Sequence, residues 1–314
     1  FAYEEDEWTE TAQKRLDICD VLHILHFYRF TEWMLKNNYK PKRPYIITSG
    51  GTDVNERLTP STLFVAMEQF VKEAYGIVVF TEDAKEKLKH AFGLLQEQIH
   101  IIKQSVWFPE QSEGKTQGIN GSSEGNPKIL LPAGLRPVKD VLYLLEALVQ
   151  LKKCYPELAF TIVGPIIDPK TYESVKEVER RHPWFHYGGN VSFLEMKVWY
   201  EWSDLVVNSS KSEGQSSSLL EAMAMERMIM ARNNPGNESL IVDGKNGVLF
   251  NDPEDFIHKF KQLMSDDRYR LKLIKQAKQD VNSKHGLDHE IDQYVELYRK
   301  ALNKKEAGTK PSKL

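Results

Sequence analysis

Two glutamates separated by seven residues mark the part of the sequence best suited to bind a charged ligand. Glu213 and Glu221 stand in SEGQSSSLLEAMA, after the apolar run at 204–208 and before the one at 227–231. A loop that leaves a buried strand and begins a helix offers free backbone N–H groups and a partial positive charge, which suit a phosphate. We expect the two carboxylates to bind hydroxyl groups, one on a sugar and the other on a ribose. The same loop holds small and polar residues that suit phosphate contacts: Gly214, Gln215, Ser216, Ser217 and Ser218.

A purely structural interpretation of these residues competes with the ligand site. Ser218 and Glu221 fit the S-x-x-E pattern of a helix capping box, which stabilises a helix start by about 1 kcal/mol without any ligand. The neighbouring Leu219 and Leu220 are more typical of a core than of a site. The residues alone leave both interpretations open.

The composition excludes several classes of protein. The chain has 314 residues, which suggests two domains, and its 42 basic and 45 acidic residues give a net charge of -3. That balance argues against a generic polycation that binds nucleic acid or an anionic membrane. No apolar run approaches the roughly 18–20 residues of a membrane span. The two cysteines, Cys19 and Cys154, exclude a disulfide framework and a cysteine-rich metal site, and they favour a reducing compartment.

Short apolar runs alternate with helical stretches along the chain, which predicts an α/β fold with parallel sheets. Several runs are apolar throughout, as expected for strands that are buried on both faces. We expect strands at 18–27, 44–48, 76–80, 99–103, 128–133, 158–164, 204–208, 227–231 and 247–250. We expect helices at 61–75, 139–153, 171–181 and 253–265.

A polar segment rich in glycine and serine divides the chain. Residues 109–127 have little to bury, and we interpret them as a linker or a mobile insertion between an N-terminal domain, 1–108, and a larger domain, 128–284. In the stretch 285–303, Leu287, Ile291 and Tyr294 recur at helical spacing. Residues 304–314 are polar and are expected to be disordered.

The residues around the two glutamates resemble those of a known enzyme family. The E-x7-E pattern of Glu213 and Glu221 is similar to the motif of retaining family-four nucleotide-sugar glycosyltransferases, which carry the glycosyl transferases group 1 domain. GGTDVNE (50–56) and LHFYR (25–29) further resemble an animal branch of the family. Three more segments resemble the family at large: LPAGLRPVKDVLYLLEAL (131–148), FTIVGP (160–165) and PGNESLIVDGKNGVLF (235–250).

The resemblance implies a GT-B type of α/β fold, with two Rossmann-like domains facing across a cleft and the first domain N-terminally incomplete. It implies a retaining, metal-independent glycosyltransferase that moves a sugar from a nucleotide-sugar donor to an acceptor that the sequence does not identify. No cofactor besides this donor substrate is then expected. The helix at 285–303 is expected to pack back on the first domain.

The resemblance also implies roles for single residues. Glu213 is expected to contact the donor sugar, and Glu221 is expected to bind the ribose hydroxyls. Lys139 is expected to neutralise the diphosphate from an exposed position after a strand. The backbone at 215–218 is expected to hold the phosphates, and Gly164, at the end of its strand, is expected to line the same site.

In the first domain, the candidate site residues are His26 and Asp53. His23 and His26 are three residues apart on an expected strand and so point to opposite faces, which prevents them from binding one metal together. We take His26, at the end of that strand, as a catalytic candidate, because the family's histidine in the next turn is replaced by Gly50. Asp53 either caps the following element or faces the cleft, and we assign it to donor binding.

Departures from the family pattern support an alternative function. The family has Gly-Arg where this chain has Ala133 and Gly134, and we expect Arg136 to supply the missing charge for catalysis. A catalytically weak, glycosyltransferase-like protein that binds nucleotide sugars is therefore the alternative. A nicotinamide-dependent oxidoreductase is disfavoured, because no G-x-G-x-x-G follows any expected strand.

The sequence predicts a cytoplasmic protein. N-x-S/T sequons at Asn208 and Asn237 flank the expected donor site, where a glycan would block it. The terminal residues 312–314, Ser-Lys-Leu, make the peroxisome the alternative, and secretion stays open because the N-terminus looks incomplete. We expect no nucleic-acid partner, and the oligomeric state is left open.

Overall fold

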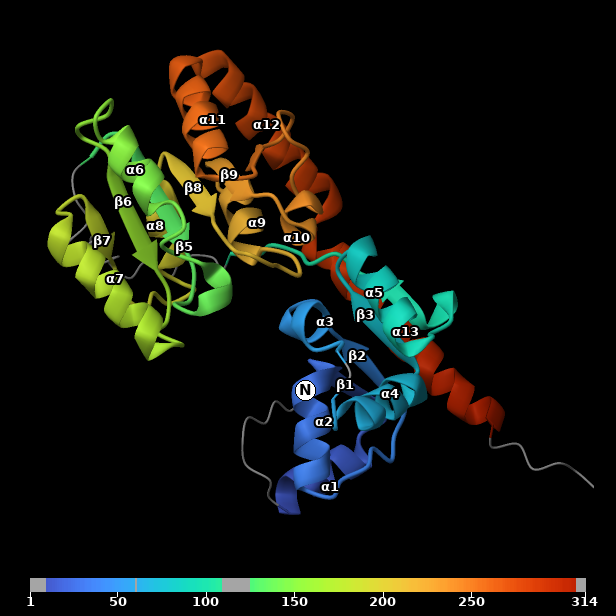
Figure 1. Ribbon diagram of the computed structural model, residues 1–314. Helices are drawn as coiled ribbons and strands as arrows, with labels where there is room; N and C mark the ends of the chain where they lie inside the picture. Colours follow the sequence, from blue (N-terminus) through green and yellow to red (C-terminus); the bar gives the residue numbers. More distant parts are fainter. Residues whose placement is uncertain (1–9, 60, 109–124, 309–314) are drawn as a thin grey trace, which may run out of the picture. The chain divides into compact units, whose positions relative to one another are not determined.

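The computed structural model describes residues 10–59, 61–108 and 125–308, and the chain forms two compact units (Figure 1). The first unit combines Phe1–Gln104 with Asp288–Leu314, and the second is the continuous stretch Ser105–Leu287. Most of the expected linker, residues 109–124, and the end of the expected tail, residues 309–314, lie outside the described residues.

The described part of the first unit is built on a parallel sheet of four strands in the order β1-β2-β3-β4. The strands are β1 (Leu22–Leu25), β2 (Tyr45–Thr48), β3 (Gly76–Val79) and β4 (Ile99–Ile101). The helices between and before them are α1 (Glu10–Ile18), α2 (Phe27–Lys36), α3 (Thr52–Glu56), α4 (Phe64–Glu73) and α5 (Glu82–Phe92), with a 3-10 turn at Gln96–Gln98.

Helices bury both faces of this sheet, which explains why its strands are apolar throughout. Ile47 and Ile77 point to one face, where they pack with Phe27, Phe70 and Phe92 from α2, α4 and α5. The residues adjacent to them in the same strands point to the opposite face. There Ile46 and Val78 pack against Leu297 of α13 (Leu287–Gly308).

The second unit holds, within its described residues, a parallel sheet of six strands in the order β10-β9-β8-β5-β6-β7. The strands are β5 (Lys128–Pro132), β6 (Ala159–Val163), β7 (Phe185–Tyr187), β8 (Leu205–Asn208), β9 (Met228–Arg232) and β10 (Val248–Phe250). The chain winds outward from β5 through β6 and β7, and then returns to the other side of β5 with β8. This reversal between β5 and β8 is the position at which open α/β sheets bind ligands.

Two helical layers cover the second sheet (Figure 1). Ile129 and Val207 face the layer formed by α6 (Leu145–Leu151), α7 (Pro169–Arg181) and α11 (Pro253–Ser265). Leu130 and Val206 face the other layer, formed by α8 (Met196–Trp202), α9 (Ser217–Ala224) and α12 (Asp267–Lys284). The short helix α10 (Pro235–Glu238) follows β9.

The expected elements differ from the observed ones at identifiable places. The helix expected at 253–265 has those bounds in α11, whereas the one expected at 139–153 begins only at Leu145. Pro137 starts a 3-10 turn, and Asp140 then takes a left-handed conformation with φ 44°, which interrupts an α-helix. The three-residue strand β7 was not predicted, and α13 continues to Gly308, so the first residues of the expected disordered tail are helical.

Helix α13 is buried along a different stripe from the one its sequence suggested. Leu287 and Ile291, which we expected to pack, are 39% and 47% exposed, whereas Leu297 and Ala301 are 4% and 1% exposed. Tyr294 joins them through a hydrogen bond of 3.0 Å between its hydroxyl and Thr48 Oγ1 of β2. The contact of α13 with the first sheet therefore depends on Tyr294 and Leu297 rather than on Leu287 and Ile291.

We predict that Leu297→Ala lowers the free energy of unfolding by about 3 kcal/mol, because it removes buried methyl groups and leaves a cavity against β2 and β3. Leu287→Ala is the matched control on the same helix, and it should cost less than about 1 kcal/mol since Leu287 is largely exposed. Urea unfolding of both variants measures the difference. Equal losses would show that α13 does not depend on this contact.

Candidate functional site

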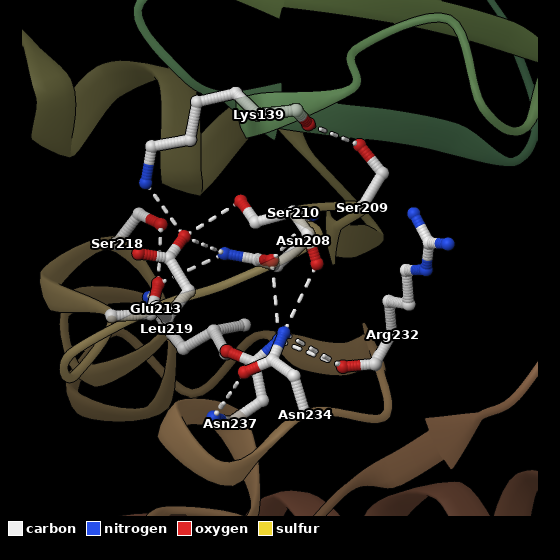
Figure 2. Close-up of polar contacts among 11 residues, drawn as sticks. Lys139, Asn208, Ser209, Ser210, Glu213, Ser218, Leu219, Arg232, Asn234 and Asn237 are labelled. Carbon is white, nitrogen blue, oxygen red and sulfur yellow. Dashed lines mark hydrogen bonds and ion pairs between the residues drawn. The ribbon is translucent and has the colours of Figure 1, made fainter. Parts of the chain in front are cut away.

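The candidate site lies at the carboxyl ends of β5, β8 and β9 in the second unit (Figure 2). Asn208 ends β8, Arg232 ends β9, and Lys139 stands in the 3-10 turn Pro137–Lys139 that follows β5. The loop from Ser209 to Ser216 then leads into α9. Parallel strands bring these residues to one edge of the sheet although they are far apart in the sequence.

A buried ion pair stands at the centre of the site. Lys139 Nζ lies 2.6 Å from Glu213 Oε1, and the two side chains are only 18% and 8% exposed. The same carboxylate oxygen accepts hydrogen bonds from the Ser210 hydroxyl at 2.7 Å and from Asn208 Nδ2 at 3.0 Å. Burial by itself would raise the pKa of Glu213, but the Lys139 charge and these hydrogen bonds outweigh it and hold the pKa below its usual value.

Three asparagines hold the loop that carries Glu213 (Figure 2). Asn208 Oδ1 accepts from the Ser210 backbone N–H at 3.0 Å and from Asn237 Nδ2 at 3.2 Å. Asn234 Nδ2 donates to the Ser210 carbonyl at 3.0 Å, and its Oδ1 accepts from the Asn237 N–H to cap α10. The sequence pattern did not lead us to expect this network. Its signal was the set of asparagines at the end of β8 and in the few residues after β9.

Two glycines allow the close backbone approaches that shape the site. A Cβ on Gly236 of α10 would lie 2.4 Å from the Glu213 carbonyl oxygen, so any side chain there would displace the Glu213 loop. Gly164 directly follows β6 with φ 147°, and a Cβ there would lie 2.3 Å from the Ala133 carbonyl oxygen. The carbonyl of Gly164 accepts a hydrogen bond from the Tyr187 hydroxyl at 2.7 Å. Gly164 therefore brings the ends of β5 and β6 together at the expected site.

Helix α9 begins at a different serine from the one that the capping-box interpretation requires. The N-cap is Ser216, whose hydroxyl accepts from the Leu219 N–H at 3.4 Å, so the helix starts at Ser217. The capping box of Ser218 and Glu221 is therefore wrong. Ser216 and Gln215 are buried, Gly214 and Ser218 are half-buried, and Ser217 is exposed. The expected phosphate-binding residues thus surround the start of α9, where the first N–H groups of a helix have no partner within the helix.

Glu221 lies just over one turn inside α9 and is bound by a residue that the sequence pattern did not indicate. The hydroxyl of Tyr200, in α8, donates to Glu221 Oε2 at 2.7 Å. Burial raises the pKa of Glu221 above its usual value, and the hydrogen bond from Tyr200 offsets part of that rise. The carboxylate therefore belongs to a polar pair between two helices rather than to a helix cap.

The cationic residues after β5 are less exposed than expected. We expected an exposed Lys139, but its side chain is mostly buried in the ion pair with Glu213. Among the described residues, the buried Nε of Arg136 has no hydrogen-bond partner. Arg232 instead pairs with Asp140 at 3.0 Å, and in Figure 2 its guanidinium points away from Glu213.

The two first-domain candidates form a separate group within the first unit. His26 lies beyond the end of β1, not on a strand as we expected, and caps α2 in a left-handed conformation with φ 67°. Its Nε2 is 3.2 Å from Thr52 Oγ1, and burial lowers its pKa. Asp53 is 1% exposed, and its Oδ1 accepts from the N–H groups of Gly51 and Val54. Its Oδ2 lies 3.7 Å from His26 Nδ1, and the donor-binding role of Asp53 stays a prediction.

Two features are absent from the part of the chain that the structure describes. In it, no group of three or more histidine, cysteine, aspartate or glutamate side chains is placed to hold a metal ion. None of its helices combines the length and the apolar character needed to cross a membrane.

Comparison with known proteins identifies the family. The model of the family described as glycosyl transferases group 1 matches residues 113–280, more than half of the chain. This chain is a group 1 glycosyltransferase. The match includes the ion pair of Lys139 and Glu213, the start of α9 and the asparagine network.

This chain spans a different share of the length of each relative that it matches. Glycosyltransferase 1 domain-containing protein 1 of Xenopus tropicalis is 29% identical over 280 residues, which are 87% of this chain and 80% of the relative. Alpha-monoglucosyldiacylglycerol synthase of Acholeplasma laidlawii is 26% identical over 196 residues, and the chain spans 49% of its length.

Solved structures confirm the expected fold class. The structure of Anabaena Alr3699/HepE in complex with UDP and glucose matches 91% of this chain and 79% of that one, with a TM-score of 0.76 at 15% identity. Sucrose-phosphate synthase from Thermosynechococcus elongatus matches 92% of this chain and 75% of its own, with a TM-score of 0.74 at 16% identity. The group 1 chain thus has the α/β architecture of GT-B proteins, with a parallel sheet in each of two Rossmann-like units.

We predict that Lys139→Met lowers the free energy of unfolding at pH 7 by about 3 kcal/mol, because it leaves the buried charge of Glu213 without its partner. The pKa of Glu213 is held below its usual value, so the pair stabilises the fold above the unfolded-state pKa and loses this effect as the pH falls through the folded-state pKa. The loss of unfolding free energy in Lys139→Met should therefore become smaller as the pH falls toward 4. Urea unfolding across this range measures it.

Lys211→Met is the matched control for this test. Lys211 is 58% exposed and lies 3.8 Å from Asp140, so its loss should cost less than about 1 kcal/mol at every pH. If the loss of unfolding free energy in Lys139→Met did not change with pH, the role given to the ion pair would be contradicted.

Proposed function

We propose that the chain is a retaining, metal-independent glycosyltransferase that moves a sugar from a nucleotide-sugar donor to an acceptor. The observation that carries the proposal is the pair of Lys139 and Glu213, which stands beside the start of α9 at the reversal point of the second sheet. Support also comes from similar structures, since Alr3699/HepE has been solved with UDP and glucose and with UDP-glucose.

The charges at this site suit a diphosphate leaving group. An ammonium group has three N–H donors, so Lys139 can keep its bond to Glu213 and still donate to a phosphate oxygen. The first N–H groups of α9 add a partial positive charge, and Arg136 has a buried Nε that lacks a partner among the described residues. Such fixed positive groups stabilise the charge that develops on a departing diphosphate, and they support metal-independent transfer.

The two carboxylates suit the two sugar rings of the donor. Glu213 is held by Lys139, Ser210 and Asn208, which fix its position for hydrogen bonds to hydroxyl groups of the transferred sugar. Glu221 lies further along α9 and is half-buried, which suits a bond to the ribose hydroxyls of the nucleotide. Retention of the anomeric configuration is part of the proposal because the family resemblance implies it.

A nucleotide-sugar-binding protein with weak catalysis is the second candidate function. The observation that favours it is at Gly134, where the family resemblance calls for arginine. A Cβ at Gly134 would lie 2.7 Å from Ile167 Cδ1, so a larger side chain would require Ile167 to move. Binding of a nucleotide sugar without turnover would favour this candidate over transfer.

We propose a cytoplasmic location, with the peroxisome as the alternative, and no nucleic-acid partner. Support comes from the sequons at Asn208 and Asn237, whose side chains are 5% and 0% exposed and hydrogen-bonded to each other. A glycan on either nitrogen would disrupt the network that holds the Glu213 loop.

A screen of UDP-, GDP- and ADP-sugars by thermal unfolding tests donor binding. We predict that the true donor, at a concentration 100 times its dissociation constant, raises the free energy of unfolding by about 2.7 kcal/mol. With that donor and an accepted sugar acceptor, NMR of the product should show the donor's anomeric configuration, and EDTA should leave turnover unchanged. Inverted product would contradict retention, and loss of turnover in EDTA would contradict metal independence.

We predict that Glu221→Gln weakens nucleotide binding by about 1–3 kcal/mol, or roughly 5- to 150-fold, because a charged acceptor for the ribose hydroxyls is lost. The matched control is Glu226→Gln, next to the end of α9, where the side chain is 62% exposed. Isothermal titration with UDP, GDP and ADP measures both variants. Equal affinities in wild type and Glu221→Gln would rule out the ribose role.

A further inference from the structure

Tyr200 is fully buried in α8, and its hydroxyl lies 2.7 Å from Oε2 of Glu221 in α9. We propose that Tyr200 is a positioning residue, which fixes the Glu221 carboxylate in the orientation that binds the ribose hydroxyls of the donor. This inference rests on the proposed function, and it adds to it a residue that selects ribonucleotides over deoxyribonucleotides.

The surroundings of Tyr200 keep its hydroxyl in place. The side chain is 0% exposed and belongs to the apolar cluster that includes Val206, Leu220 and Ile229. Its ring meets the ring of Phe108 edge-on, with 6.4 Å between centroids and an interplanar angle of 78°. A ring enclosed on a sheet face cannot swing its hydroxyl away, so the donor atom is a fixed reference point for Glu221.

The partners of Glu221 make its orientation depend on Tyr200. Glu213 is fixed by at least three side chains, whereas among the described residues Tyr200 is the one side chain that hydrogen-bonds to Glu221. An ionised carboxylate has about four acceptor positions, and Tyr200 occupies one of them. The others stay available for two hydroxyl groups on adjacent carbons, provided that the carboxylate does not rotate.

The direction of the hydrogen bond suits this role. Burial and the neighbouring carboxylate raise the pKa of Tyr200 well above its usual value, so the hydroxyl keeps its proton and donates it. Donation favours the charged form of Glu221, which is the form that accepts bonds from ribose. Tyr200 thus acts on both the direction and the charge of the carboxylate.

A merely structural bond between α8 and α9 would also make Tyr200 important for stability, because a buried hydroxyl needs a partner. Loss of stability therefore does not distinguish the two roles. The discriminating quantity is the affinity ratio between a ribonucleotide and its 2′-deoxy form, since it depends on how Glu221 meets the ribose and not on how firmly the helices pack.

The experiment compares wild type with Tyr200→Phe, which removes one oxygen and keeps the ring. The probes are UDP, GDP and ADP and, for the tightest binder, its 2′-deoxy form. We expect wild type to bind the ribonucleotide more tightly than its 2′-deoxy form. In Tyr200→Phe this affinity ratio should fall about fivefold, which corresponds to the loss of one hydrogen bond. Tyr45→Phe is the matched control, because Tyr45 is 5% exposed and its hydroxyl donates to the Phe70 carbonyl at 2.7 Å. It should leave the preference unchanged.

The pH dependence of binding gives a second readout. Nucleotide affinity should fall as the pH drops through the pKa of Glu221, and Tyr200→Phe should move this fall to higher pH because the charged form loses a hydrogen bond. Among the described residues, the polar and charged groups that reach α9 from neighbouring elements include Tyr200 of α8 and Lys278 of α12, which donates to the Ala224 carbonyl and lies 4.0 Å from Glu226. Arg227, next to β9, donates to the carbonyl of Met225 just after α9. Lys278→Met should not change the pH at which nucleotide affinity falls.

The outcomes separate this inference from the proposed function. If Glu221→Gln weakens binding while Tyr200→Phe keeps the wild-type preference and pH profile, the positioning role is overturned and the ribose role of Glu221 stands. If no nucleotide binds to wild type, or if Glu221→Gln binds as wild type does, the donor site itself is wrong and the inference is overturned with it. A reduced preference with a shifted pH profile supports the role of Tyr200.

Discussion

The ion pair of Lys139 and Glu213 is the contact on which the other features of the second unit depend. Two charged side chains that are mostly buried remain ionised only when each has a close partner of opposite charge and further hydrogen bonds. The sheet reversal between β5 and β8 supplies the partner, since it places the turn after β5 beside the loop after β8. Asn208 and Ser210 supply the hydrogen bonds, and Gly236 permits α10 to support the same loop. The site of this chain thus depends on segments that follow three different strands, β5, β8 and β9.

Features encoded by nearby residues could be predicted from the sequence. The apolar runs located the strands β2, β3, β4, β5, β6, β8, β9 and β10, and the spacing of Glu213 and Glu221 located the loop and helix of the site. The α/β class followed from strands that are buried on both faces. These predictions succeed because burial and periodicity act over a few residues, and because loops at strand ends collect polar groups.

Features that depend on distant partners could not be predicted in this way. Nothing in the sequence around Glu221 shows that Tyr200, on another helix, binds it, and an S-x-x-E pattern cannot say which serine caps the helix. The burial of Lys139 follows from a residue 74 positions away. The left-handed backbone at Asp140 and His26 is set by the turns around them, which single-residue preferences predict poorly. Such errors fall at the site because its residues satisfy each other across elements.

The return of α13 to the first sheet has a consequence for the order of folding. The second unit is one continuous stretch, so it can complete its sheet and both helical layers from residues 105–287 without waiting for α13. The first unit begins earlier but waits for α13, and until then Ile46 and Val78 present an uncovered apolar surface. A chain in which α13 has not yet docked would therefore hold a finished second unit and an unfinished first one. During that interval the exposed face of the first sheet is the natural target for chaperones and the surface most prone to aggregation.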